Sequence, residues 1–151
     1  MSRLSFGLSQ LWKPAAVILG VIGWSMVASA SDLAVAHPWS RVTPPGVTIG
    51  VGYLEIVNTG TADRLLSVSS PRAERVEIHE SRMEAGMQSM HQSATLPIAA
   101  HSQTRLAPGG LHLMLLGIKR PLLAGEQVPL MLMFERGGHV MTALVVEAEP
   151  N

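Results

Sequence analysis

The chain has 151 residues with eleven basic and eleven acidic side chains, six histidines, nine methionines and no cysteine. A balanced charge gives no electrostatic reason to expect nucleic acid or an anionic membrane surface as a partner. The absence of cysteine excludes disulfide bonds, a lipid-modified cysteine and any thiolate ligand for a metal.

The first element expected is a cleaved signal peptide over residues 1–30. Arg3 and Lys13 flank a polar start, and the apolar run over 14–27 is shorter than the roughly twenty residues that span a bilayer. The run ends in Ala28-Ser29-Ala30, a small-x-small pattern that signal peptidase reads. We therefore expect an exported, periplasmic domain over 31–151, slightly acidic and at most peripheral to the membrane, with an uncleaved anchor as the alternative.

The rest of the chain alternates apolar and polar residues over short runs, and no stretch keeps a helical period for long. The strands expected from this pattern are 33–36, 49–58, 64–69, 75–80, 88–96, 103–106, 111–116, 128–135 and 139–147. Turn signals separate them, among them Glu84-Ala85-Gly86 and Gly137-Gly138. Many short strands without a repeat or a linker predict one all-β domain, an antiparallel sandwich or a closed sheet.

Four histidine and methionine side chains are candidate metal ligands. Side chains along a strand point alternately to its two faces, so His112 and Met114 share one face and the neighbouring leucines share the other. The same alternation turns His79 away from the core. Met90 follows a turn that can bring it back beside His79. These residues can therefore be presented together.

The chemistry of this set favours copper(I). Thioether sulfur and imidazole nitrogen select soft copper(I), whereas calcium and magnesium prefer oxygen ligands. Thioethers also carry no proton and form no disulfide in an oxidising compartment. Zinc is disfavoured because its usual ligands are Cys, His and carboxylate, and a blue-copper site requires cysteine. We therefore expect one copper(I) ion bound by His79, Met90, His112 and Met114.

The spacing of the four residues, H-x10-M-x21-H-x-M, resembles the motif of the periplasmic copper A chaperone (PCuAC) family. Blocks similar to that family lie at 37–41, 52–54, 73–80, 106–110 and 117–122. The resemblance covers the chain after the signal peptide. It implies a cupredoxin-like β-sandwich that delivers copper(I) toward the copper A centre of cytochrome c oxidase, often alongside a thioredoxin-like copper protein.

The chain departs from the family pattern in two places. Ser81 and Gln88 stand in a segment where members often carry extra methionines. Some members have a His/Met-rich C-terminal tail for a second copper ion, whereas residues 148–151 contain neither residue type. A second site on such a tail is therefore not expected.

The other histidines and methionines are interpreted as structural or solvent-facing. Met83, Met87 and His91 share the hairpin of His79 and are expected to face solvent or cover the site, with a secondary binding surface as the alternative. His139-Val140-Met141 repeats the His-x-Met pattern, but no partner stands at a matching spacing. Packing or solvation is also the interpretation for His37, His101, Met131, Met133, Trp39 and Tyr53.

The sequence gives little support for catalysis, since it has no cysteine nucleophile, Gly-x-Ser-x-Gly turn, Gly-rich phosphate loop or His-Glu-x-x-His helix. Glu77, Glu80 and Glu84 are expected to form a solvated strand edge, with docking of a basic partner as the alternative. Three functions stay open: a copper(I) chaperone, which is favoured; a copper buffer or resistance protein without a dedicated acceptor; and a metal-free adhesion or assembly domain.

Overall fold

The computed structural model describes residues 32–148, and its regular secondary structure is entirely β-strand. Within this range no helix is long and apolar enough to cross a membrane. The signal peptide expected over 1–30 lies outside the described residues. The strands are β1 (Leu33–Arg41), β2 (Ile49–Asn58), β3 (Asp63–Ser69), β4 (Arg75–Glu84), β5 (Met87–Ser93), β6 (Leu96–Ile98), β7 (Ser102–Leu106), β8 (Leu111–Leu116), β9 (Gln127–Phe134) and β10 (Gly138–Glu147).

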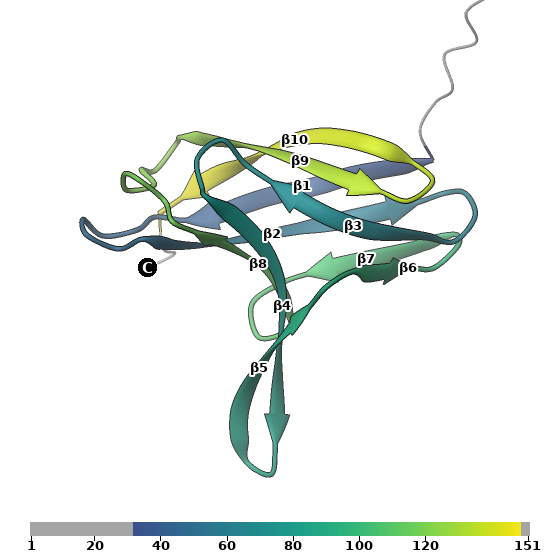
Figure 1. The fold of residues 1–151 in the computed structure, drawn as a ribbon, viewed down its shortest axis with the longest axis horizontal. Helices are drawn as coiled ribbons and strands as arrows, with labels where there is room; N and C mark the ends of the chain where they lie inside the picture. Colours follow the sequence, from purple (N-terminus) through teal and green to yellow (C-terminus); the bar gives the residue numbers. More distant parts are fainter. Residues whose placement is uncertain (1–31, 149–151) are drawn as a thin grey trace, which may run out of the picture.

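Hydrogen bonds join the strands in the order β5-β4-β8-β2-β1-β10-β9-β3-β6, and β7 pairs with β2. A further pairing of β3 with β4 closes the path on itself around one core. The pairs are antiparallel except for β1 with β10, which is parallel. Figure 1 shows the β4–β5 hairpin standing out from the body that the other strands form. The all-β architecture expected from the sequence is confirmed.

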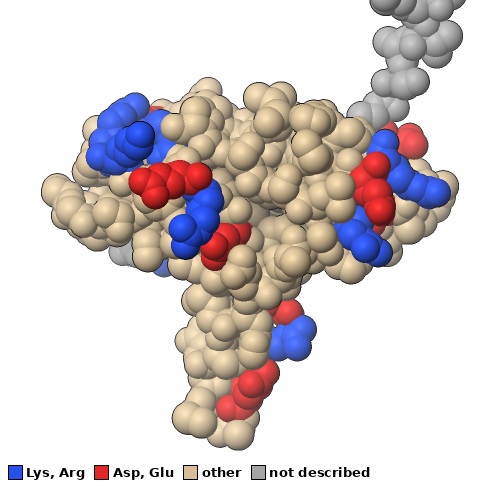
Figure 2. Space-filling model, viewed as in Figure 1, with Lys and Arg blue, Asp and Glu red and all other residues tan. Residues whose placement is uncertain are grey.

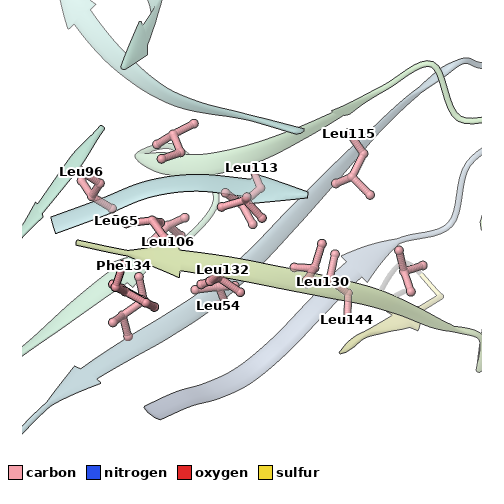
Figure 3. Packing of buried hydrophobic residues seen from close by; sticks show 14 of the residues in the cluster. Leu54, Leu65, Leu96, Leu106, Leu113, Leu115, Leu130, Leu132, Phe134 and Leu144 are labelled. Atoms are coloured by element: carbon pink, nitrogen blue, oxygen red, sulfur yellow. The ribbon is translucent and has the colours of Figure 1, made fainter. Parts of the chain in front are cut away.

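Leucine side chains dominate the core. Leu113 and Leu115 of β8 and Leu130 and Leu132 of β9 are completely buried (Figure 3), because alternate positions of these strands face inward. Burying each such side chain contributes about 1.5–3 kcal/mol to stability. Among the described residues, no methionine belongs to the buried cluster. Methionine is therefore not used here as the flexible gap-filler that it often is in protein cores.

Several expected strand bounds were wrong, since β4 also runs on to Glu84, four residues past the expected end at 80. β1 continues past the expected end at residue 36, because His37 adopts a left-handed φ of 46° and the pairing with β2 resumes at Trp39 after a bulge. The strand expected over 88–96 is divided, because β5 ends at Ser93 and the next residues leave β4 to pair with β3 as β6. The bounds expected for β2 and β8 are confirmed.

The projecting hairpin turns at the residues that the sequence predicted for a turn. Ala85 and Gly86 take φ values of 50° and 79°, as the two central residues of a tight hairpin turn must. This turn places Glu84 opposite Met87, and the register that follows places Ser81 opposite Met90. The turn therefore fixes where along β4 the Met90 side chain lies.

Candidate metal centre

The four residues expected to bind metal lie on one face of three neighbouring strands. His79 of β4 pairs directly with His112 of β8, and their ring centroids are 6.0 Å apart. Met114 lies two residues after His112 and so shares its face. Met90 pairs with Ser81, which makes it the diagonal neighbour of His79 across β4 and β5, within reach of a long side chain. The register therefore brings residues that are far apart in the chain into one region.

The spacing of the two rings suits a shared ion. With metal–nitrogen bonds of about 2.0 Å, two imidazole rings on one ion have centroids at most about 6.5 Å apart. The 6.0 Å between His79 and His112 is below that limit and above the roughly 5.1 Å of a tetrahedral angle, so the rings approach one another by about 1 Å when a four-coordinate ion binds. Both side chains are largely enclosed, with His79 14% and His112 6% exposed. Both rings are therefore largely shielded from solvent.

Glu77 sets the orientation of the His79 ring. Its carboxylate accepts a hydrogen bond from His79 Nε2 at 2.8 Å and another from Arg75 Nε at 2.8 Å. These two bonds lower the pKa of the Glu77 carboxyl, so it is ionised and accepts. With the proton on Nε2, the lone pair of His79 is on Nδ1, which is buried and has no hydrogen-bond partner. A buried nitrogen of this kind lacks a partner that a metal ion would supply.

His112 is oriented by the backbone. Its Nδ1–H donates to the carbonyl of Gly110 at 2.9 Å, which leaves the lone pair on Nε2. Metal-binding histidines commonly donate their other ring N–H to a carboxylate or a backbone carbonyl in this way. Both histidines thus have the outer partners that a ligand histidine needs. The donor set fits copper(I), since it combines two imidazoles with two neighbouring thioethers.

The two methionines differ in exposure. Met114 is half-buried on β8, between Glu77 of β4 and Val51 of β2 in the register. Met90 is 53% exposed on the projecting hairpin. One thioether is therefore held by the body of the domain, and the other is accessible from solution. Within 32–148 no group of three or more His, Asp or Glu side chains is placed to hold a metal ion.

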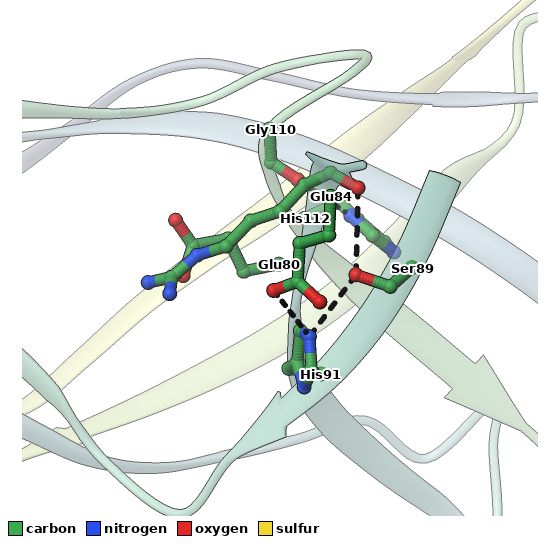
Figure 4. Close-up of polar contacts among 7 residues, drawn as sticks. Glu80, Glu84, Ser89, His91, Gly110 and His112 are labelled. Carbon is green, nitrogen blue, oxygen red and sulfur yellow. Dashed lines mark hydrogen bonds and ion pairs between the residues drawn. The ribbon is translucent and has the colours of Figure 1, made fainter. Parts of the chain in front are cut away.

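Of the other hairpin residues, His91 lies on the opposite face, and Met83 and Met87 lie near the tip of the hairpin. His91 pairs with Glu80 and so faces the opposite side from His79, where its Nε2 contacts Glu84 and Ser89 (Figure 4). Met83 and Met87 are each 71% exposed near the turn. Their expected position in solvent is confirmed.

In Figure 2 the charged side chains of the hairpin gather along one edge of it, and the rest of its visible surface is uncharged.

Glu77 was interpreted from the sequence as part of a solvated edge, and that interpretation is wrong. Its side chain is 18% exposed and bridges Arg75 and His79. The hydrogen bond that the Gly110 carbonyl accepts from His112 was also not predicted from the sequence. The alternation that places Glu77 and His79 on one face of β4 is the signal that could have found the first contact, whereas a backbone carbonyl leaves no trace in the sequence.

Known proteins resemble the chain in sequence and in fold. A family model described as "Putative lipoprotein LpqE-like" matches residues 33–146. A putative lipoprotein, Lxx21020 of Leifsonia xyli subsp. xyli, is 30% identical over 143 residues, which cover 88% of this chain and 86% of that protein.

Solved structures with the same fold include two in copper-bound form. The copper-bound PCuAC domain from PmoF2 has a TM-score of 0.67 and 29% identity, covering 78% of this chain and 93% of that one. The solution structure of CuI-DR1885 from Deinococcus radiodurans has a TM-score of 0.57 and 28% identity, covering 80% and 83%. The expected resemblance to PCuAC domains and the cupredoxin-like sandwich are confirmed.

Proposed function

Because this chain belongs to the LpqE-like family of putative lipoproteins, within the PCuAC group, we propose that it is an exported copper(I) chaperone. It binds one copper(I) ion at the face of β5, β4 and β8 through His79, Met90, His112 and Met114. The single observation that supports this most strongly is the unpartnered, buried Nδ1 of His79, 6.0 Å by ring centroid from a histidine whose free nitrogen is Nε2. Relatives with a copper-bound form support the choice of metal.

The roles of the chain's own residues follow from their partners. Glu77 and Gly110 hold the two imidazole rings with one lone pair each available. Met114 is placed by a core strand whose other face carries the completely buried Leu113 and Leu115. Four neutral ligands leave the charge of the bound ion uncompensated, so the site holds the ion without a thiolate and can release it to an acceptor with stronger ligands.

Release begins at Met90. It is the most exposed of the four residues and lies on the hairpin that stands out from the body (Figure 1). A donor atom of the acceptor can replace the Met90 thioether while the two histidines and Met114 still hold the ion. The ion therefore moves by exchange of one ligand at a time and is never released into solution.

The acceptor we propose is the copper A subunit of cytochrome c oxidase, with a thioredoxin-like copper protein as a helper. A periplasmic location after signal-peptide cleavage fits both the acceptor and the family's lipoprotein relatives. The role is binding and transfer, without a catalytic step. The competing function is a copper buffer, which would use the same site but have no dedicated acceptor.

Two measurements test this function. Copper(I) competition titration against a chromophoric chelator is expected to show tight binding of one ion, and this tight binding is lost in Met114→Leu. Anaerobic mixing with the soluble copper A domain is then expected to transfer copper faster than a small-molecule copper(I) complex of equal affinity does. If transfer is no faster than from that complex, the result supports the copper buffer and contradicts the chaperone.

A further inference from the structure

We propose a second copper(I) site on the outer face of β9 and β10, formed by His139, Met131, Met141 and Met133. The pairing of the two strands places His139 directly opposite Met133 and Met141 directly opposite Met131. Residues paired across two strands, and residues two apart along one strand, share a face. One imidazole and three thioethers therefore occupy four adjacent positions of one surface.

Two of these donor atoms are already in contact. His139 Nδ1 lies 3.2 Å from Met131 Sδ, in an N–H···S hydrogen bond that an ion would replace once the ring proton is on Nε2. For bonds of about 2.0 Å to nitrogen and about 2.3 Å to sulfur, this separation corresponds to an angle of about 95° at a shared ion. Such an angle is acceptable for a three- or four-coordinate site. The pair is therefore spaced as two ligands of one metal.

This face is directed away from the core. Leu130, Leu132 and Leu144, the alternate residues of the same two strands, are completely buried, so the methionines between them face outward. Met141 is 67% exposed and His139 is also exposed. Core packing therefore does not account for the thioethers on this face.

The distribution of methionine over residues 32–148 supports the same conclusion. The seven methionines in this range fall into two groups, one around the hairpin and β8 and one on β9–β10, and none is in the buried cluster. Each group contains a His-x-Met unit on a strand, His112 with Met114 and His139 with Met141. Both groups thus present the donor set that selects a soft monovalent ion.

The second site is expected to bind more weakly than the first. His139 and Met141 are exposed, whereas both histidines of the first site are enclosed and one has a carboxylate partner. Ordering exposed side chains around an ion costs conformational entropy, and this cost is smaller at the first site, where Met90 is the one ligand that is mostly exposed. The second site therefore fills after the first and gives the protein a capacity of two copper ions.

The test is a titration of the exported chain with copper(I) under anaerobic reducing conditions, followed by NMR of methionines labelled at the methyl carbon. The first equivalent is expected to shift the Met90 and Met114 signals, and the second to shift those of Met131 and Met141. Met131→Leu/Met141→Leu is expected to bind one ion instead of two. Leucine has a similar volume, so the fold is retained. Met83→Leu/Met87→Leu, on the exposed hairpin tip, is the matched control and is expected to keep both ions.

The proposal would be overturned if the Met131 and Met141 signals did not shift at a several-fold excess of copper(I). It would also be overturned if Met131→Leu/Met141→Leu still bound a second ion. The two sites are read separately. Shifts at Met131 and Met141 without shifts at Met90 and Met114 would leave this second site standing and remove the proposed chaperone site.

Discussion

The Glu77 carboxylate accepts a hydrogen bond from His79 Nε2 at 2.8 Å, and this contact decides which nitrogen of His79 can bind an ion. Glu77→Ala removes the acceptor and frees the ring to rotate and change tautomer. Loss of such an outer partner typically lowers metal affinity about 10- to 100-fold. We expect a decrease of that size in a copper(I) competition titration.

Two further variants distinguish positioning from general destabilisation. Glu77→Gln keeps an amide oxygen that can accept from Nε2 and is expected to recover much of the affinity. Glu80→Ala removes a neighbouring carboxylate that binds Arg82 on the opposite face of β4, and is expected to leave copper binding unchanged. Equal losses in Glu77→Ala and Glu80→Ala would contradict a specific role for Glu77.

The two methionines are expected to differ when each is replaced by leucine. Met114 is half-buried on a core strand, so Met114→Leu removes a ligand that the fold already holds in place and lowers the equilibrium affinity strongly. Met90 is accessible on the hairpin, so Met90→Leu is expected to lower affinity less and, because it vacates the position that the acceptor's donor atom takes, to speed transfer to an acceptor. Titration and stopped-flow transfer measure the two effects. If a variant matches the wild type in both copper(I) affinity and transfer rate, the methionine that it replaces is not a ligand.

Acid stability is expected to depend on Asp63. Burial raises the pKa of this carboxyl, but bonds from the backbone N–H groups of Arg64, Arg136 and Gly137 outweigh it, and the net effect is a lowered pKa. A lowered folded-state pKa gives stability that is present above the unfolded value of about 3.9 and is lost as pH falls through the folded value. Asp63→Asn should therefore destabilise the protein at pH 7 and flatten the decline below about pH 4. Chemical denaturation at several pH values measures this, and an unchanged acid decline would be the contrary result.

Gly52 of β2 is expected to tolerate no side chain. A Cβ there would lie 2.8 Å from Cδ1 of Leu144, which is completely buried and has little room to move. Overpacking of this kind typically costs about 1–3 kcal/mol. Gly110→Ala is the control for stability, because the nearest atom to its Cβ is 3.8 Å away. Similar unfolding midpoints for the two alanine variants would show that the core adjusts more easily than its packing indicates.

Much of the fold was predictable because its strands follow simple alternation. β2 and β8 begin and end where the sequence pattern indicates, since turn residues bound them and their inward positions are apolar except for Asn58 at the end of β2. The bulge at His37 was not predictable, because a positive φ at a residue other than glycine depends on the strands that hold it. The division of 88–96 likewise depends on a change of partner strand.

The candidate site was predictable in its residues but not in its supporting contacts. Spacing and alternation identified His79, Met90, His112 and Met114, but the direct pairing of His79 with His112 needs the register of two strands far apart in the chain. The same reasoning could have identified the His139 and methionine group on β9 and β10. The Gly137-Gly138 turn sets the register of this hairpin, and following it would have placed His139 beside Met133.

In the site that we propose, two imidazole nitrogens and two thioether sulfurs share one copper(I) ion. X-ray absorption spectroscopy of Met131→Leu/Met141→Leu, loaded with one equivalent of copper(I), measures this directly because only the β4–β5–β8 site is then available. We expect a shell of two nitrogen and two sulfur scatterers, with one sulfur lost on further substitution of Met90 or Met114 by leucine. A shell without sulfur, or one unchanged by both substitutions, would contradict it.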